Sequence, residues 1–350
     1  MTDIPRIELR AGYSISQLIR GGWQLSGDHG AVDRDRAIAD VVSFYDAGIT
    51  TFDCADIYTG VEEIYGEGLR ALAAARGTEA ARAMRVHTKY VPDIAALATL
   101  SAADTERIVT RSLKRLGRER LDLVQFHWWD YAVPGMEDAV GHLIDLQARG
   151  LIEHLGITNF DHTRMVQIAS MVDLVAAQIQ FSLLDRRPLE GFTRLAAERD
   201  VAIICYGVLA GGFLTDAWLG KSDPGFAFEN RSLVKYRLII EEFGGWTPFQ
   251  ELLGTLRRIA DGHGVDIAAV AMRAMIEDDA ATALIIGARS ASHLDRTTSA
   301  TGFSLTDADR SAIAASIKDA PGPRGSVFDL ERDRTGTHGR IMKYNLNDPA

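Results

Sequence analysis

Short apolar segments alternate with longer amphipathic segments along almost the whole chain of 350 residues. The apolar segments are rich in Val, Ile and Leu, and they predict strands that are buried on both faces, as in a parallel sheet. Parallel strands need long crossover connections, and the amphipathic segments supply a helix for each one. Eight such repeats fit a closed (β/α)8 barrel of the α/β class better than an open sheet. The predicted strands cover residues 16–22, 49–53, 85–89, 121–127, 152–159, 174–181, 201–208 and 283–287.

The expected helices lie between these strands and carry recognisable end signals. Acidic residues open the helix predicted at 33–47, and Gly117 and Gly150 close two of the others. Before the first strand, residues 6–15 predict a hairpin that turns at Ala11-Gly12. The remaining helices are expected at 60–76, 103–116, 136–149, 161–170, 190–199, 249–263, 267–277 and 292–300.

No linker rich in Pro, Gly or Ser divides the chain, so residues 1–320 are predicted to form a single barrel domain. Residues 211–246 follow the seventh strand and carry repeated glycines without a continuous element. A loop of this length in a barrel is usually a lid or a binding loop. Residues 321–350 begin with the breaker cluster PGPRGS and are predicted to form an extended C-terminal tail.

The composition excludes several classes of protein. Hydrophobic residues make up 47% of the chain, which is enough for a large core. The net charge is −10 without an extended basic run, so nucleic acids and anionic membrane surfaces are unfavoured partners. The N-terminus has no secretory signal, and no segment approaches the roughly 18 apolar residues of a membrane span. Cys54 and Cys205 suit reduced thiols, so a cytoplasmic protein is expected, and a homo-oligomer is left open.

Three polar residues stand where predicted strands end, about one strand–helix unit apart. They are Asp53, Lys89 and His127, and Tyr58 lies on the loop after the first of them. In a barrel of this class the carboxyl ends of the strands converge on one pocket, so these residues are expected to be neighbours. A carboxylate, an ammonium, a phenol and an imidazole together predict a site that donates protons. The alternative is that each is an ordinary buried polar group, since Asp–Lys pairs are often structural.

Around these four positions the sequence resembles the aldo-keto reductase family, and the likeness covers residues 15 to 300. The resemblance is carried by fragments in family order: TTFDCADIYTGVEEIYGEGL, HTK, QFHW, GITNF, AAQIQFSLLDR, CYGVLAGGFL and IIGARS. It implies transfer of a hydride from NADPH to an aldehyde or ketone, without a metal. In the reverse direction the same enzyme would act as an alcohol dehydrogenase. Tyr58 would be the general acid, with Lys89 lowering its pKa, Asp53 holding Lys89 and His127 orienting the substrate oxygen.

The resemblance also assigns cofactor residues. Arg289 is matched to the adenosine 2′-phosphate, so NADP is the predicted cofactor and NAD the less favoured one. Ile286 departs from the family's commoner Pro, and Gly207-Val208 depart from its Ser-Pro. The predicted cofactor residues are Gly22, Trp23, Gln24, Asp53, Thr158, Asn159, Gln178, Tyr206, Gly207, Leu209, Ala210, Gly211, Gly287, Arg289, His293 and Thr297.

Within this set Thr158, Asn159 and Gln178 are matched to the nicotinamide carboxamide, and Tyr206 to the aromatic ring that stacks on the nicotinamide. The glycines at 207 and 211 would let the backbone approach the pyrophosphate. His293 and Thr297 stand where family members often place Gln and Asn against the adenine, and they are a further departure from the family pattern. The residues expected to contact the small carbonyl substrate are Trp23, Tyr58, His127 and Trp128.

Two other interpretations compete with a reductase. The first is a cofactor-binding regulatory subunit that resembles the potassium-channel β subunits. Those proteins share the barrel and much of the group formed here by Asp53, Tyr58, Lys89 and His127. The second is an unrelated isomerase or lyase barrel, which the Tyr58–Lys89 pair disfavours. His127 favours reduction of a C=O bond, because members of the family that reduce steroid C=C bonds have Glu there. The histidines have no metal-ligand spacing, so no metal is expected.

The tail of residues 321–350 lacks an apolar period but ends in the apolar sequence IMKYNL. The C-terminal segment of this family commonly borders the substrate pocket. The tail is therefore predicted to pack on the barrel mouth or on a neighbouring chain and to influence substrate choice.

Overall fold

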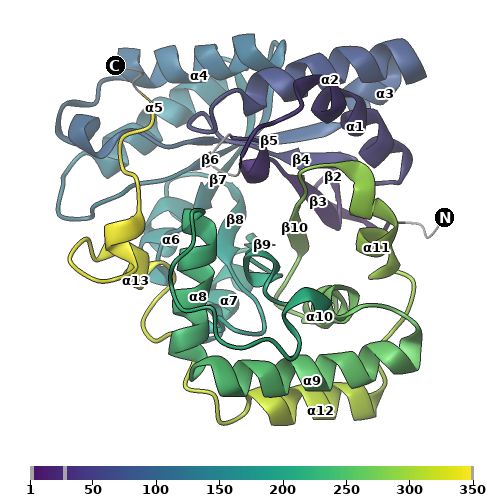
Figure 1. Ribbon diagram of the computed structural model, residues 1–350. Coiled ribbons are helices and arrows are strands. Elements are labelled where there is room, and N and C mark those ends of the chain that lie inside the picture. The colour runs from purple at the N-terminus through teal and green to yellow at the C-terminus, as the bar shows by residue number, and fades with distance from the viewer. Residues whose placement is uncertain (1–3, 27–29, 348–350) are drawn as a thin grey trace.

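A closed barrel of eight parallel strands forms the centre of the computed structural model, which describes residues 4–26 and 30–347 (Figure 1). The order around the barrel is β10-β3-β4-β5-β6-β7-β8-β9, so the last strand closes on the first. The predicted (β/α)8 barrel is therefore confirmed. The strands are β3 (Leu18–Gly21), β4 (Thr51–Asp53), β5 (Arg85–Tyr90), β6 (Leu121–Phe126), β7 (Ile152–Thr158), β8 (Leu174–Gln180), β9 (Ala202–Tyr206) and β10 (Ala283–Gly287).

A hairpin closes the N-terminal end of the barrel. Its antiparallel strands, β1 (Arg6–Arg10) and β2 (Tyr13–Ser16), turn at Ala11-Gly12 as predicted. The hydroxyl of Tyr13 lies 3.0 Å from His87 Nε2 inside the barrel. Because the hairpin fills this end, a ligand site has to lie at the opposite, carboxyl end of the strands.

Side chains along β6 alternate between the barrel interior and the layer under the helices, as the period of a strand requires. Leu123 belongs to the interior cluster, whereas Val124 and Phe126 pack in the outer core. Lys89 of β5 is in register with Gln125 of β6. Polar side chains near the carboxyl ends of neighbouring strands therefore lie in the same layer of the barrel.

A ring of helices surrounds the strands, mostly where the sequence predicts them (Figure 1). Side-chain caps explain two of the starts, because Asp33 caps α1 and Ser101 forms a capping box with Asp104 at α4. The predicted helices are α1 (Arg34–Asp46), α2 (Val61–Arg76), α4 (Ala102–Leu116), α5 (Met136–Ala148), α6 (His162–Ala169), α7 (Phe192–Ala197), α9 (Trp246–His263), α10 (Ile267–Ile276) and α11 (Leu294–Ser299).

The expectation that residues 211–246 hold no continuous element is wrong. The helix α8 (Arg231–Phe243) occupies the second half of this segment, capped by Asn230. The glycines that suggested a loop lie outside the helix, and Gly244 follows its last residue. Other elements without a prediction are α3 (Thr78–Ala83), α12 (Asp307–Ile317), and the 3-10 turns η1 (Trp23–Leu25), η2 (Ile94–Thr99), η3 (Arg187–Leu189), η4 (Ala210–Gly212), η5 (Asp216–Trp218), η6 (Ala291–His293) and η7 (Gly339–Ile341).

The tail borders the open mouth of the barrel (yellow in Figure 1). It contains the short helix α13 (Asp329–Arg332) and ends beside α4, where Arg111 donates a hydrogen bond of 3.1 Å to the carbonyl of Asn347. Phe328 and Leu346 line the cavity at the mouth. The tail therefore packs on the barrel of its own chain, the first of the two predicted docking places, and residues 348–350 lie outside the described part.

Three further features concern the described residues alone. Cys54 and Cys205 are both buried and free. In residues 4–26 and 30–347, no helix is long and apolar enough to cross a membrane. The same residues hold no group of three His, Cys, Asp or Glu side chains placed to bind a metal ion.

Candidate active site

A cavity of about 650 Å³ opens at the carboxyl ends of the strands. Its volume lies within the range of roughly 300–1,000 Å³ that is typical of small-molecule and cofactor sites. The barrel strands, the segment after β9, the loop after β10 and the tail all contribute to its lining. The predicted site residues that line it are Trp23, Gln24, Asp53, Tyr58, Lys89, His127, Thr158, Asn159, Gln178, Tyr206, Gly207, Leu209, Gly211, Gly287, Arg289, His293 and Thr297.

Three predicted residues do not line this cavity. Gly22 is enclosed, because a Cβ there would lie 2.6 Å from Val61 and 2.9 Å from the carbonyl of Asp53. Ala210 belongs to η4 after β9 and is fully buried.

The placement of Trp128 on the pocket wall is also wrong. Its side chain is fully buried, and its indole donates to the carbonyl of Val133. Trp129 lines the cavity instead, with its ring centre 4.4 Å from that of His127.

Lys89, Asp53 and Tyr58 meet at the floor of the cavity, as predicted. Lys89 Nζ lies 2.6 Å from Asp53 Oδ2 and donates a second bond of 2.8 Å to the carbonyl of Cys54. The same ammonium is 4.9 Å from the centre of the Tyr58 ring. A phenol, a cation and a carboxylate thus share one small volume at the ends of β4 and β5.

Burial is the largest single effect on the pKa values of Tyr58 and Lys89. It raises the pKa of Tyr58 above its ordinary value of 10.0, and the charge of Lys89 offsets only part of that effect. Lys89 thus lowers the pKa of Tyr58, as expected, but burial has the larger effect in the opposite direction. Burial alone would lower the pKa of Lys89, but Asp53 and Tyr58 outweigh it and raise that pKa. At neutral pH the site therefore holds a protonated phenol beside a charged ammonium.

Two amides fix the carboxylate of Asp53, in addition to Lys89. The Nε2 atoms of Gln125 and Gln178 donate to Asp53 Oδ1 over 3.1 and 2.6 Å. Gln178 also donates to Gln125 Oε1 over 3.1 Å. The amide hydrogens of Gln178 are therefore bonded to Asp53 and Gln125 in this structure. They are not directed at a nicotinamide carboxamide, which is the contact predicted for Gln178.

His127 is a neutral imidazole with a defined tautomer. Its Nδ1 lies 2.9 Å from the carbonyl of Thr158, and a carbonyl only accepts, so Nδ1 carries the hydrogen. Burial and the positive charge of Arg332 lower the pKa of His127 to about 3. Its Nε2 is buried without a partner among the described residues. His127 can therefore accept a hydrogen bond in the cavity through Nε2.

The residues matched to the nicotinamide carboxamide leave polar atoms available. Thr158 Oγ1 is buried without a partner in the described part of the chain. Tyr206 donates its hydroxyl hydrogen to Asn159 Oδ1 over 2.8 Å, which leaves the Nδ2 hydrogens of Asn159 for another group. Asn159 has a φ of 63°, a left-handed conformation that Asn tolerates better than most residues. These donors and acceptors fit a primary carboxamide.

The N-terminal half of α8 lies over the glycines after β9. A Cβ on Gly207 would lie 2.7 Å from the hydroxyl of Tyr236, and one on Gly211 would lie 2.6 Å from its ring. Both glycines therefore make room for Tyr236 in this structure. Ser232 of the same helix accepts a bond of 2.8 Å from the indole of Trp23 across the cavity.

The loop after β10 forms the outer end of the cavity. Arg289 is exposed there and donates a bond of 3.1 Å to the carbonyl of Ala31. His293 and Thr297 follow on η6 and α11 and line the same end. The position of Arg289 at an exposed rim, near backbone from the loop before α1, leaves its guanidinium accessible to an anion.

The sequence prediction missed several lining residues. Lys235 and Tyr236 lie on α8, which was not predicted, and Phe328 belongs to the tail. Gln125, which bonds to Asp53 but does not line the cavity, was also missed, although it had a signal: it stands two positions before His127 and so faces the same side. Lys235 and Phe328 had none, because their segments show no regular pattern that ties them to the barrel.

Comparison with known proteins agrees with this geometry. The model of the Aldo/keto reductase family matches residues 17–318. Aldo-keto reductase YhdN of Bacillus subtilis is 26% identical over 326 residues, which are 89% of this chain and 94% of the relative. NADH-specific methylglyoxal reductase of Escherichia coli is 23% identical over 317 residues, 85% of this chain and 93% of the relative.

A solved structure, the glycerol dehydrogenase AKR11B4 from Gluconobacter oxydans, has the same fold with a TM-score of 0.72. Its sequence is 24% identical, and the match covers 93% of this chain and 97% of that one. The family match spans most of the barrel and includes Asp53, Tyr58, Lys89 and His127. The chain therefore belongs to the aldo/keto reductase family of oxidoreductases.

Proposed function

We propose that the chain is an NADP(H)-dependent oxidoreductase that reduces an aldehyde or ketone to an alcohol, and that also oxidises sugar-like alcohols in the reverse direction. The observation that carries this proposal is the placement of Tyr58 beside the buried Lys89–Asp53 pair at the floor of a cofactor-sized cavity. A protonated phenol at this position could supply the proton that a carbonyl oxygen needs during reduction, and this supports the proposal.

A bound nicotinamide supplies the hydride, and the chain's own residues handle the proton. Tyr58 donates its hydroxyl proton to the carbonyl oxygen as that oxygen gains negative charge. Burial keeps Tyr58 protonated through neutral pH, so the donor is in its active form. The ammonium of Lys89 then stabilises the phenolate that is left, and Asp53 keeps Lys89 in place.

The tautomer of His127 narrows the role proposed for it. A neutral ring with its hydrogen on Nδ1 has only a lone pair at Nε2, so it cannot donate to a carbonyl oxygen. It can accept from the hydroxyl of an alcohol or from a hydroxyl next to the carbonyl. This arrangement supports substrates with neighbouring oxygen functions, such as hydroxyaldehydes and polyols.

The cofactor assignment rests on polar side-chain atoms that remain available for hydrogen bonds to a ligand. Thr158 Oγ1 and the amide of Asn159 suit a carboxamide, and Tyr206 stands beside them at the end of β9. NADP is proposed over NAD because Arg289 presents a guanidinium at the far end of the cavity. Relatives differ on this point, since one of them is named as NADH-specific.

The test is turnover of a panel of short hydroxyaldehydes and simple aldehydes, followed through the absorbance of NADPH. Tyr58→Phe keeps the ring that packs on Trp23 and removes the proton, so it is expected to lose at least ~100-fold in kcat. NADPH binding, measured by fluorescence, should persist in this variant. Tyr45→Phe on α1, a phenol that does not line the cavity, serves as the matched control.

Two results would count against the proposal. Turnover in Tyr58→Phe at the rate of the parent would remove Tyr58 from the mechanism. NADPH binding by the parent without turnover of any carbonyl in the panel would favour a cofactor-binding regulatory protein.

A further inference from the structure

Arg332 reaches from the tail into the carboxyl ends of two barrel strands. Its Nη1 donates to the carbonyl oxygens of Trp128 and Trp129, the latter over 2.6 Å. Its Nη2 donates to the carbonyl of Asn159 over 2.7 Å and to the hydroxyl of Tyr131 over 3.0 Å. All four hydrogens of the two Nη atoms are therefore used, and they connect the loop after β6 to the loop after β7.

These acceptors adjoin the residues to which the proposed function assigns substrate and nicotinamide contacts. Trp128 follows His127 directly, and Trp129 packs its ring edge-on against the imidazole of His127. Asn159 is held in the left-handed region, with a φ of 63°, while its side chain accepts from Tyr206. A left-handed conformation is uncommon outside glycine, even for Asn, and surrounding contacts help to hold it; one of those contacts is Arg332.

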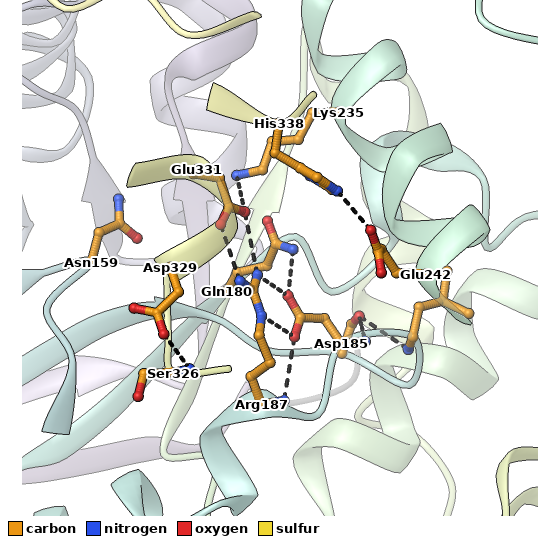
Figure 2. Close-up of polar contacts among 12 residues, drawn as sticks. Asn159, Gln180, Asp185, Arg187, Lys235, Glu242, Ser326, Asp329, Glu331 and His338 are labelled. Carbon is orange, nitrogen blue, oxygen red and sulfur yellow. Dashed lines mark hydrogen bonds and ion pairs between the residues drawn. The ribbon is translucent and has the colours of Figure 1, made fainter. Parts of the chain in front are cut away.

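The neighbouring residue anchors Arg332 to the barrel. Figure 2 shows Glu331 reaching from α13 to Arg187, whose Nη1 lies 3.1 Å from Glu331 Oε2. Arg187 also pairs with Asp185 over 2.7 Å, and Lys235 of α8 lies 3.7 Å from Glu331 (Figure 2).

Arg187 and Lys235 both affect the pKa of Glu331. Burial alone would raise the pKa of Glu331, but Arg187 and Lys235 outweigh it and lower that pKa to about 2. Glu331 is therefore ionised at every pH at which the enzyme would work, and α13 is fixed on the barrel by charge.

We propose that Arg332 is a positioning residue, through which the C-terminal tail sets the backbone beside His127 and Asn159 for binding the nicotinamide end of the cofactor and the substrate. The inference rests on the proposed function and goes beyond it, because it gives the tail a part in organising the site itself. Arg332 acts through backbone carbonyl groups and takes no part in proton transfer.

The test compares Arg332→Gln, Arg332→Lys and the control Arg340→Gln. Arg340 is exposed on η7, and its replacement removes the same charge from the same tail. Two ligands are titrated by fluorescence or calorimetry: NADPH, and adenosine 2′,5′-bisphosphate, which lacks the nicotinamide. Arg332→Gln should bind the adenosine fragment as the parent does but bind NADPH more weakly.

Kinetics provide the second readout. Displacing groups that orient a substrate by about 1 Å can cost ~100-fold in rate, so kcat/KM of Arg332→Gln should fall by about 10- to 100-fold. Arg332→Lys keeps the charge but cannot serve four acceptors, so it should restore part of the loss. NMR should also show the pKa of His127 rising in Arg332→Gln, because the Arg332 charge helps to lower it.

Each outcome has a defined meaning. If the parent binds NADPH but Arg332→Gln binds it equally well and keeps kcat/KM, the inference is overturned and the proposed function stands. If the parent binds no nicotinamide cofactor, the proposed function fails first. Equal weakening of both ligands in Arg332→Gln would mean a general structural role and would also overturn the inference. Should Arg332→Gln fail to fold, the same comparison with Arg332→Lys decides.

Discussion

The ammonium of Lys89 lies 2.6 Å from the carboxylate of Asp53, and both side chains are at most 5% exposed. A buried pair of this kind is stabilising only while both partners are present, because removing one leaves an uncompensated charge in the protein interior. Asp53 also accepts from Gln125 and Gln178, so the carboxylate cannot move away to find water. The same pair therefore affects both the stability of the barrel and the charge beside Tyr58.

Replacing Lys89 with Met should reduce both activity and stability. The variant loses the cation that stabilises the Tyr58 phenolate, so kcat should fall by at least ~100-fold. It also leaves Asp53 unpaired, which should lower the free energy of unfolding by about 3–5 kcal/mol in urea denaturation.

The double variant Asp53→Asn with Lys89→Met separates the two effects of the pair. It should regain much of the stability without regaining activity. Normal turnover in Lys89→Met, with an unchanged pH–rate profile, would show that Lys89 does not act on Tyr58.

The meeting of Asp53 with Lys89 was predictable because it obeys the simplest rule of the fold. Asp53 ends β4 and Lys89 lies near the end of β5, and the barrel brings such positions together whatever lies between them. The same period of two along the chain also identifies Gln125 as a residue on the same side as His127.

The same alternation continues for three residues after β6, which ends at Phe126. Trp128 packs in the outer core with Val124 and Phe126, and Trp129 lines the cavity with His127, the reverse of the prediction. The prediction of Trp128 on the pocket wall came from the family resemblance, whereas the period of two favours Trp129. The sequence does not reveal what holds this loop, because Arg332 of the distant tail donates to the carbonyl groups of both residues.

The net protonation of Tyr58 was also beyond sequence reasoning. A Tyr near a Lys suggests a lowered pKa, and that effect is present in the structure. How deeply the phenol is buried depends on every wall of the cavity, including α8 and the tail, and burial is the larger effect. The direction of the net shift in the Tyr58 pKa therefore depends on the assembled barrel and not on the Tyr58–Lys89 pair alone.

Arg289→Ala tests the choice of cofactor. Only NADPH carries the 2′-phosphate, so the variant should bind NADPH more weakly and NADH as before. A hydrogen bond to a charged group is worth roughly 1.5–3 kcal/mol, which corresponds to about a 10- to 100-fold change in Kd. Fluorescence titration with both cofactors measures it.

Arg296→Ala, which removes an exposed charge from α11, is the control for the cofactor titration. Its affinity for both cofactors should match that of the parent. Equal losses for NADPH and NADH in Arg289→Ala would assign Arg289 to the adenine or to the fold instead.

Asp56 predicts a pH dependence of stability. Burial and the charge of Glu62 raise the pKa of Asp56 from 3.8 to about 8, so the folded protein keeps a proton that the unfolded chain releases. The resulting stabilisation is complete below about pH 4 and is lost as the pH rises towards 8, by about 1.4 kcal/mol for each pH unit in that interval.

Asp56→Asn should flatten this profile, since an amide does not titrate. It can still accept from Val91 N and the side chain of Asn347, which now bond to Asp56 Oδ2. Urea midpoints at several pH values between 5 and 8.5 measure the difference. Asp93→Asn, at a second carboxylate that holds Leu346 and Asn347, is the control. A parent and an Asp56→Asn variant with parallel profiles would contradict the raised pKa.

Arg20 gives the last prediction, which concerns stability alone. Its guanidinium is buried on β3 at 1% exposure, and none of its three nitrogens has a partner among the described residues. The cation lies over the ring of Phe44, 4.4 Å from its centre, but this contact does not replace the hydrogen bonds that water would make.

Replacing Arg20 with Met should therefore stabilise the protein, because Met follows the same path past Phe44 without a buried charge. Exchange of buried charged groups for apolar ones of similar volume is often stabilising by about 1–4 kcal/mol, and a gain of this order is expected in thermal and urea unfolding. Arg20→Lys, which keeps a charge and loses the planar contact, should be less stable than the parent. A loss of stability in Arg20→Met would mean that the guanidinium has a binding partner in solution, and a search for that ligand would begin between β3 and α1.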